Sequence, residues 1–221
     1  MDEYTHYLEQ FGEYGEVVEV NYPIITVVGL PSVTVNEIVA FETGDKGQVI
    51  ALNQDSVHVL LFSQTRLKTK TKVSRTNSRL ATPVGKELLG QTINPFGYPL
   101  SGKKTKPDTE EMRPIDIPPE GIARRIKITK NLATGTALVD IMLPIGKGQR
   151  QLILGDRKTG KSAFALNTIR NQITEGTITI YAAIGKKVVD IKQIEEFMIQ
   201  GDRKDRMLII ATTASDSPGM I

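Results

Sequence analysis

The residues QLILGDRKTGKS, Gln151 to Ser162, decide the fold of the second half of the chain. Gln151 to Leu154 is a short apolar run that predicts a β-strand. The next eight residues match the phosphate-loop pattern G-x-x-x-x-G-K-[ST]; they are Gly155, Asp156, Arg157, Lys158, Thr159, Gly160, Lys161 and Ser162. An ordinary turn between a strand and a helix does not require this spacing of glycine and lysine. We therefore predict a loop that binds the phosphates of a nucleotide.

Each part of the loop has an expected role. Gly155 and Gly160 allow the backbone to wrap closely, so the N–H groups of residues 159–162 and the N-terminus of the next helix converge on phosphate. Lys161 is expected to bridge the β- and γ-phosphates of ATP, and the Ser162 hydroxyl is expected to ligate Mg²⁺. The expected cofactors are therefore ATP, or ADP, and Mg²⁺. Two further basic residues in the loop either point to solvent or add charge near the phosphates, and the sequence leaves both possibilities open.

The residues that follow the loop alternate between helix and strand patterns. Helices are expected at Ser162 to Thr174 and at Val188 to Gln200. Strands are expected at Thr177 to Ala183 and at Met207 to Ala211. Strands and helices that alternate at this spacing predict a parallel sheet with right-handed crossovers.

The N-terminal half has a different pattern. Apolar residues recur with a helical period from Tyr4 to Phe11 and predict a short amphipathic helix. Packing against its own domain is favoured over docking on a partner. Short apolar runs then predict a small antiparallel barrel or sandwich; the runs are Glu16 to Val20, Ile24 to Val28, Glu37 to Phe41, Gly47 to Leu52 and Val57 to Phe62. A linker-like stretch begins at Thr82. We therefore expect an N-terminal segment, 1–14, a β-barrel domain, 15–82, and a nucleotide-binding domain, 83–221.

A basic segment beside the barrel allows two interpretations. Lys68, Lys70 and Lys72 alternate with threonines, and no acidic residue lies between Ser56 and Lys86. A basic strand beside a barrel is also found in nucleic-acid-binding proteins, but these stack bases on aromatic side chains, and Phe62 is the only aromatic residue between Glu42 and Pro95. We therefore favour an edge strand protected by lysine, and expect no nucleic-acid partner.

Composition excludes several classes of site. The chain has 221 residues, 39% of them hydrophobic, with a formal net charge of +3. It has no cysteine, so a disulfide framework, a thiolate metal site and a cysteine nucleophile are all excluded. His6 and His58 are isolated in the sequence, so no metal site other than Mg²⁺ is expected. The sequence contains no apolar run of about 20 residues and no signal-type segment, so membrane association is expected only through partners.

Dispersed segments of the chain resemble the alpha subunit of F-type ATP synthases, from about Gly15 to the last residue. In the barrel and linker they are Val27 to Leu30, Asn36 to Phe41, Gly85 to Gly90 and Asn94 to Gly97. Later in the chain they are Thr134 to Asp140, Leu143 to Arg150, Gly155 to Arg157, Ala182 to Lys187 and Ala211 to Asp216. The Gly-Asp-Arg start of the phosphate loop is similar to the alpha type and differs from the glycine- and alanine-rich loop of the catalytic beta subunit.

The resemblance implies a fold and an assembly. The expected fold is a six-stranded antiparallel β-barrel, which forms a crown with its neighbours, followed by a truncated RecA-like nucleotide-binding domain. The implied function is a regulatory, non-catalytic site that holds MgATP without turnover in a proton-translocating ATP synthase. The implied partners are beta-type catalytic subunits in an alternating ring, a central shaft subunit and a peripheral stalk. The complex would lie on the cytoplasmic face of a bacterial cell membrane or its organelle equivalent.

The chain departs from the alpha pattern at a few positions. Lys158 stands where that subunit usually has Gln, and Ser162 replaces the usual Thr. Lys186 stands where alpha subunits usually have Gln and beta subunits have the catalytic Glu. The sequence stops at Ile221, before an acidic Mg²⁺ partner or an arginine finger, so we expect a fragment. Two other classes stay open: a RecA-class hexameric RNA translocase, which should show a stacking platform, and a catalytic export-type ATPase, which should carry Glu at position 186.

Overall fold

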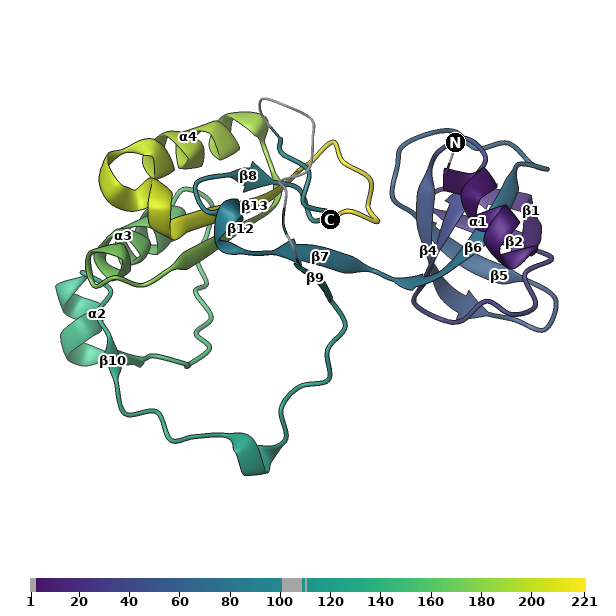
Figure 1. The fold of residues 1–221 in the computed structure, drawn as a ribbon. Coiled ribbons are helices and arrows are strands. Elements are labelled where there is room, and N and C mark those ends of the chain that lie inside the picture. The colour runs from purple at the N-terminus through teal and green to yellow at the C-terminus, as the bar shows by residue number, and fades with distance from the viewer. Residues whose placement is uncertain (1–2, 101–108, 110) are drawn as a thin grey trace.

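The computed structural model describes residues 3–100, 109 and 111–221, which form two lobes (Figure 1). The first lobe is a barrel, and the second is a small parallel sheet with helices. The chain passes from the barrel into the second lobe through β7 (Ala81–Val84), which pairs antiparallel with β9 (Glu111–Pro114). No helix in the described part of the chain is long and apolar enough to cross a bilayer.

The barrel is closed and has six antiparallel strands in the order β1-β2-β5-β4-β3-β6. The strands are β1 (Tyr14–Asn21), β2 (Ile24–Val28), β3 (Glu37–Phe41), β4 (Lys46–Leu52), β5 (Val57–Leu61) and β6 (Lys72–Arg79). Alternate side chains of each strand point inward, and residues such as Val27, Phe41 and Val59 are completely buried. The expected six-stranded barrel is therefore confirmed.

The expected N-terminal helix is present and packs against the barrel. Helix α1 (Glu3–Phe11) contacts β6 and β3, and its Tyr4 is buried. The Phe11 ring lies 5.8 Å from the guanidinium carbon of Arg75 on β6, and Glu3 forms a 2.6 Å ion pair with Lys46 at the start of β4. The interpretation of this helix as part of its own domain is confirmed.

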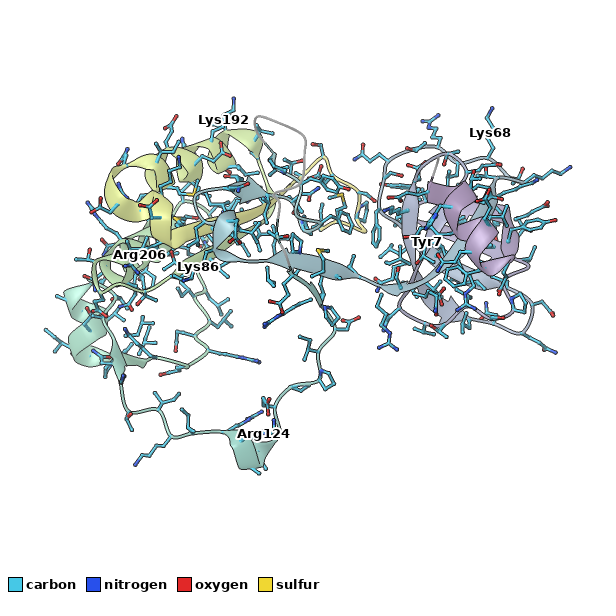
Figure 2. The ribbon with its side chains drawn as sticks, in the orientation of Figure 1. Tyr7, Lys68, Lys86, Arg124, Lys192 and Arg206 are labelled. Carbon is cyan, nitrogen blue, oxygen red and sulfur yellow. The ribbon has the colours of Figure 1, made fainter. Side chains whose placement is uncertain are left out.

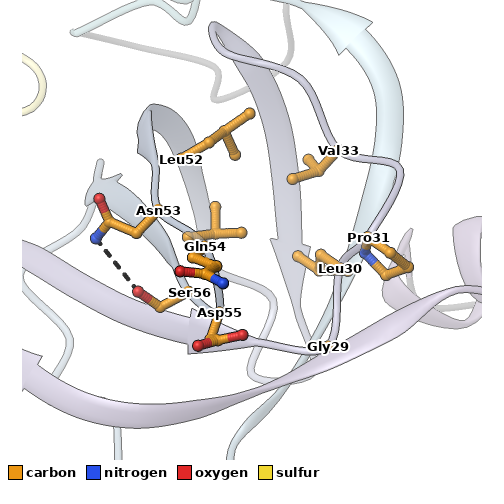
Figure 3. A pocket seen from close by; sticks show the side chains of 10 residues that line it. Gly29, Leu30, Pro31, Val33, Leu52, Asn53, Gln54, Asp55 and Ser56 are labelled. Atoms are coloured by element: carbon orange, nitrogen blue, oxygen red, sulfur yellow. Dashed lines mark hydrogen bonds between the residues drawn. The ribbon is translucent and has the colours of Figure 1, made fainter.

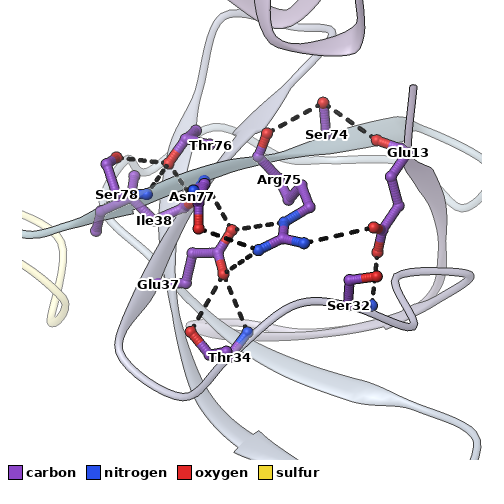
Figure 4. Close-up of polar contacts among 10 residues, drawn as sticks. All are labelled: Glu13, Ser32, Thr34, Glu37, Ile38, Ser74, Arg75, Thr76, Asn77 and Ser78. Atoms are coloured by element: carbon purple, nitrogen blue, oxygen red, sulfur yellow. Dashed lines mark hydrogen bonds and ion pairs between the residues drawn. The ribbon is translucent and has the colours of Figure 1, made fainter. Parts of the chain in front are cut away.

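A buried ion pair connects β3 to β6 on one side of the barrel (Figure 4). The Arg75 guanidinium donates to both oxygens of the Glu37 carboxylate, at 3.1 and 3.2 Å. Backbone N–H groups of Asn77 and Thr34 also donate to this carboxylate, at 2.8 and 3.0 Å. The hydrogen bond to Glu37 raises the pKa of the Arg75 guanidinium. Because every oxygen of the buried carboxylate has a donor, the charge is compensated, and loss of one partner would cost about 3 kcal/mol.

The basic segment is not the edge strand that the sequence predicted. Lys68 and Lys70 lie in the loop before β6, with Lys70 in the left-handed region at φ 70°, and only Lys72 belongs to a strand. The physical reason is closure: β6 pairs with both β1 and β3, so the barrel has no free edge to protect. Figure 2 shows Lys68 on the outside of the barrel, where its charge is solvated.

The second lobe contains the expected parallel sheet, in the order β12-β13-β8. Its strands are β8 (Thr92–Ile93), β12 (Thr179–Lys186) and β13 (Met207–Thr213). The expected helices are α3 (Lys161–Thr174) and α4 (Val188–Ile199). The shorter elements are η1 (Lys86–Leu88), η2 (Ile122–Arg124), β10 (Asn131–Leu132), α2 (Ala137–Met142), β11 (Ile145–Gly146) and η3 (Gly201–Arg206).

The side chains of β13 separate two small cores. Met207 and Ile209 pack with Ile173 of α3 and with Ile191 and Ile194 of α4. Leu208, from the opposite face of the strand, packs with Leu88 and Ile93. This alternation places both helices on one face of the sheet, with α3 following directly from the phosphate loop.

The predicted strand Gln151 to Leu154 is wrong, because this segment is extended but forms no strand pairing in the structure. Leu152 and Leu154 are 76% and 81% exposed. A parallel strand must be paired and covered on its faces, whereas this run lines an open pocket with α2 residues such as Met142 and with Phe164. Apolar composition alone was therefore insufficient to make a strand here.

Candidate functional site

The phosphate-loop residues form a tight turn that leads directly into α3. Lys158 and Gly160 both adopt left-handed backbone conformations, at φ 64° and 93°. Such a conformation favours glycine and is uncommon for lysine. The two turns bring Gly155 close to the start of α3, and the loop is exposed on the surface. The local sequence therefore places the first N–H groups of α3 at an open end, where they are free to meet an anion.

The Lys161 side chain turns back onto the loop. Its ammonium donates to the carbonyl oxygen of Gly155 at 2.6 Å and to that of Asp156. The Thr159 hydroxyl donates to the same Asp156 carbonyl at 2.8 Å. A Cβ added to Gly155 would lie 2.8 Å from the Thr159 hydroxyl oxygen, so a larger residue here would have to displace this hydroxyl. These contacts hold the lysine charge at the centre of the loop.

Ser162, in the first turn of α3, meets a lysine from another element. The Lys186 ammonium, at the end of β12, donates to the Ser162 hydroxyl oxygen at 3.4 Å. The backbone of β12 is fixed at this point, because the Gly185 N–H donates to the Thr212 hydroxyl at 3.0 Å and the Lys186 carbonyl accepts from the Ala214 N–H at 3.1 Å. Gly185 has φ 59°, so a backbone turn precedes the lysine.

Polar side chains of α3 attach the loop helix to the segment before α2. Asn171 and Gln172 donate to the carbonyl of Ala133, at 2.8 and 2.9 Å, and Asn167 donates to the carbonyl of Thr134 at 3.3 Å. Gln172 and Thr134 are buried. The helix that carries the loop is therefore held by these amides in its C-terminal half as well as by its apolar core.

Asp140 in α2 organises the turn that receives these amides. Its carboxylate accepts the backbone N–H of Thr134 at 2.8 Å, the Thr134 hydroxyl at 2.7 Å and the Gly135 N–H at 3.0 Å. The backbone hydrogen bond of Thr134, followed by its hydroxyl, holds the pKa of Asp140 below its ordinary value. An ionised Asp140 thus fixes the segment against which α3 is bound.

The donors at the loop fit phosphate well and Mg²⁺ less well. Lys161 and Lys186 supply two ammonium groups beside the free N–H groups of α3, whereas the loop contains one acidic residue, Asp156. Ser162 offers one oxygen of the kind Mg²⁺ prefers. No group of three or more His, Asp or Glu residues that could hold a metal occurs among the described residues.

Another cavity lies at one end of the barrel and lacks the chemistry for phosphate (Figure 3). Its volume is about 290 Å³, and loops on either side line it, from Gly29 to Val33 and from Leu52 to Val57. The only charged residue in its lining is Asp55. A carboxylate repels phosphate, so this cavity is not the site that the sequence predicts.

Comparisons with known proteins match both lobes. The beta-barrel domain of the ATP synthase alpha/beta family matches residues 11–77, and the family's nucleotide-binding domain matches residues 135–221. The chain belongs to the ATP synthase alpha/beta family. The resemblance noted in the sequence is therefore confirmed, together with the barrel and the partial nucleotide-binding domain.

Three proteins of this family named ATP synthase subunit alpha are similar over nearly the whole chain. The protein of Acetivibrio thermocellus is 37% identical over 218 residues, which is 96% of this chain and 43% of the relative. That of Caldanaerobacter subterraneus subsp. tengcongensis is 38% identical over 209 residues, 94% of the chain and 41% of the relative. Subunit alpha 1 of Rhodopirellula baltica is 40% identical over 210 residues, with coverage of 94% and 41%. The chain thus spans about two fifths of the length of these relatives.

The structure adds contacts to the site that the sequence did not predict. Lys186 is separated from Ser162 by 24 positions, and its place depends on how β12 lies beside α3. The amides of Asn167, Asn171 and Gln172 also contribute, by fixing α3. The spacing of these three amides along one helix is the sequence signal that could have indicated them. The resemblance places Lys186 where beta subunits have the catalytic Glu, but its contact with Ser162 is visible only in the structure.

Proposed function

We propose that this chain is a regulatory, non-catalytic nucleotide-binding subunit of a rotary, proton-translocating ATP synthase. It binds ATP or ADP with Mg²⁺ at the loop from Gly155 to Ser162. The observation that carries the proposal is the loop itself, which presents Lys161 and the start of α3 to one open site in a chain of the ATP synthase alpha/beta family.

The residues of the loop have different roles in binding. The N–H groups at the start of α3 donate to phosphate oxygens, and the helix dipole favours their charge. Lys161 exchanges its contacts with the loop carbonyls for contacts with the phosphates, which are the stronger acceptors. The Ser162 hydroxyl is the residue that would hold Mg²⁺, whose chemistry is to neutralise phosphate charge. None of these groups activates water, so the proposed site has no catalytic residue.

The proposed assembly follows from the relatives. Proteins named ATP synthase subunit alpha are similar along both lobes. We therefore propose that beta-type catalytic subunits alternate with this chain in a ring, with a central shaft and a peripheral stalk as further partners. The complex would contribute to ATP synthesis and hydrogen ion transport at the cytoplasmic face of a membrane, or its organelle equivalent, with this chain peripheral to the bilayer.

A calorimetric titration with ATP tests the binding site. Lys161→Ala should weaken binding at least about tenfold, because it removes a charge-assisted contact with phosphate. Lys192→Ala, on the exposed surface of α4, is the matched control and should leave affinity unchanged (Figure 2). GTP should bind about as well as ATP, because the contacts offered at the loop are to phosphate. Equal binding by both variants would refute the proposed site.

A further inference from the structure

Lys186 brings a second cation to the phosphate site. Its ammonium lies 3.4 Å from the Ser162 hydroxyl oxygen, although the two residues belong to different elements. Lys186 is paired in register with Thr213 of β13, and its carbonyl accepts the Ala214 N–H. The backbone beneath the side chain is therefore held by the sheet, and the lysine is directed at the loop by the fold.

The Ser162 hydroxyl is the oxygen that the loop offers to Mg²⁺. An ammonium has three donors and no lone pair, so Lys186 cannot coordinate a metal. A cation that shares this hydroxyl also repels Mg²⁺. Lys186 therefore makes Ser162 a weaker ligand for Mg²⁺ than it would be without this neighbour, and adds attraction for phosphate.

We propose that Lys186 takes over the charge-neutralising role of Mg²⁺, so that this site binds metal-free nucleoside polyphosphate about as tightly as the Mg²⁺ complex. Metal-free ATP carries more negative charge than MgATP. Two lysines are available to bind it, Lys161 from α3 and Lys186 from β12. The inference rests on the proposed nucleotide-binding function and specifies the chemical form of the ligand.

The test compares ATP titrations of the whole chain in excess Mg²⁺ and in EDTA. The unaltered chain should show affinities within about threefold of each other. Lys186→Gln should weaken binding in EDTA about tenfold, because it removes one charge-assisted hydrogen bond to phosphate. Binding in Mg²⁺ should fall much less or rise, because repulsion of the metal is removed as well. Lys186→Arg should keep the metal-free affinity.

Lys187→Gln is the matched control, because it removes the same charge from the adjacent residue. Lys187 is exposed and begins α4, where its carbonyl accepts the Ile191 N–H at 3.1 Å. The Lys187→Gln substitution should change the ATP affinity by no more than about twofold, either in Mg²⁺ or in EDTA, as expected for a solvated charge. Circular dichroism of each variant checks that the chain is still folded. Inorganic tripolyphosphate, titrated in EDTA, should show the same loss of affinity in Lys186→Gln and not in Lys187→Gln, although it carries no nucleobase.

The outcomes separate the inference from the proposed function. If the unaltered chain binds no ATP in either condition, both fail. If ATP binds only with Mg²⁺, or if Lys186→Gln and Lys187→Gln weaken metal-free binding equally, the role of Lys186 is overturned while the nucleotide site stands.

Discussion

At the scale of single residues, the loop depends on the absence of a side chain at Gly155. Gly155→Ala would place a methyl group 2.8 Å from the Thr159 hydroxyl oxygen, which then loses its hydrogen bond to the Asp156 carbonyl. We expect ATP affinity to fall about tenfold, because the displaced loop no longer holds Lys161 in place. The thermal unfolding midpoint should change little, since the loop is exposed.

Gly121→Ala is the matched control for this substitution. Gly121 has φ −63° and no atom within 4 Å of an added Cβ, so alanine fits there without strain. ATP titration and thermal unfolding of both variants check the prediction. Unchanged affinity in Gly155→Ala would show that the tight turn is not needed for binding.

The residue scale also shows what sequence could establish about the site. The spacing of Gly155, Gly160 and Lys161 predicted a loop in front of a helix, because such a pattern is a purely local property. The contact between Lys186 and Ser162 could not be predicted, because it depends on the position of β12 relative to α3. The left-handed conformation of Lys158 was also unforeseen, since a lysine rarely adopts it.

At the scale of elements, the stability of the segment that supports α3 depends on pH through the Asp140 carboxylate. Its folded-state pKa lies below the ordinary value of 3.8, so its contribution is fully present above pH 3.8 and is lost as the pH falls through the lower, folded pKa. An NMR titration should find the carboxyl pKa below 3.8. A value at or above it would contradict the hydrogen bonds to Thr134 and Gly135.

The Asp140→Asn variant distinguishes the effect of this carboxylate from the effects of other groups that become protonated in acid. At neutral pH the amide of Thr134 should exchange its hydrogen faster in this variant, because the charged acceptor is lost. The difference between the variant and the unaltered chain should disappear as the pH falls through the folded pKa. Asp202→Asn is the control, on the exposed surface of η3, and should leave this exchange unchanged.

Element by element, the sequence predicted what depends on periodicity and missed what depends on partners. Helix α3 was expected to begin at Ser162 and begins at Lys161, and α4 ends within one residue of its expected end. The run Gln151 to Leu154 is as apolar as a buried strand, but strand formation requires a partner that a sequence pattern cannot reveal. The prediction of an edge strand around Lys68 was wrong for the same reason, because the barrel closes and leaves no free edge.

At the scale of the whole molecule, the two lobes touch through a few contacts. The Ser217 hydroxyl donates to the Leu61 carbonyl at 2.8 Å, and the rings of Phe62 and Phe96 lie 4.9 Å apart. Gly219 fits closely against Leu61, because a Cβ there would lie 2.5 Å from its carbonyl oxygen. Each lobe has its own core, so we expect them to differ in resistance to proteolysis.

Among the residues that the structure describes, trypsin should cut first between β9 and β10, where the chain follows an exposed arc that includes Arg124 (Figure 2). Ile122 and Ile126 beside it are 87% and 91% exposed. The basic loop of the barrel is exposed as well, but the Lys70 N–H donates to Val17 on β1 at 2.7 Å, which holds it in place. Mass spectrometry of a digestion series should therefore find the barrel intact after the second lobe is cleaved.

The variant Arg124→Gln, Arg125→Gln removes two of the exposed sites and should slow the first cleavage. Lys68→Gln, on the barrel loop, is the control and should leave the rate unchanged. Equal rates of loss for both lobes would contradict two independent cores.

Under the proposed function, a complete ring that contains this chain should gain no ATP turnover from its site. Hydrolysis needs a group that orients the attacking water and accepts its proton, and at neutral pH the ammonium of Lys186 has no lone pair for this. The nearest carboxylate downstream, Asp190, lies in the first turn of α4 and would have to reach back past Lys186. Turnover is measured in a reconstituted ring in which only this subunit keeps a working phosphate loop. Bound nucleotide without turnover is the expected result, whereas turnover that disappears with Lys161→Ala would overturn the non-catalytic role.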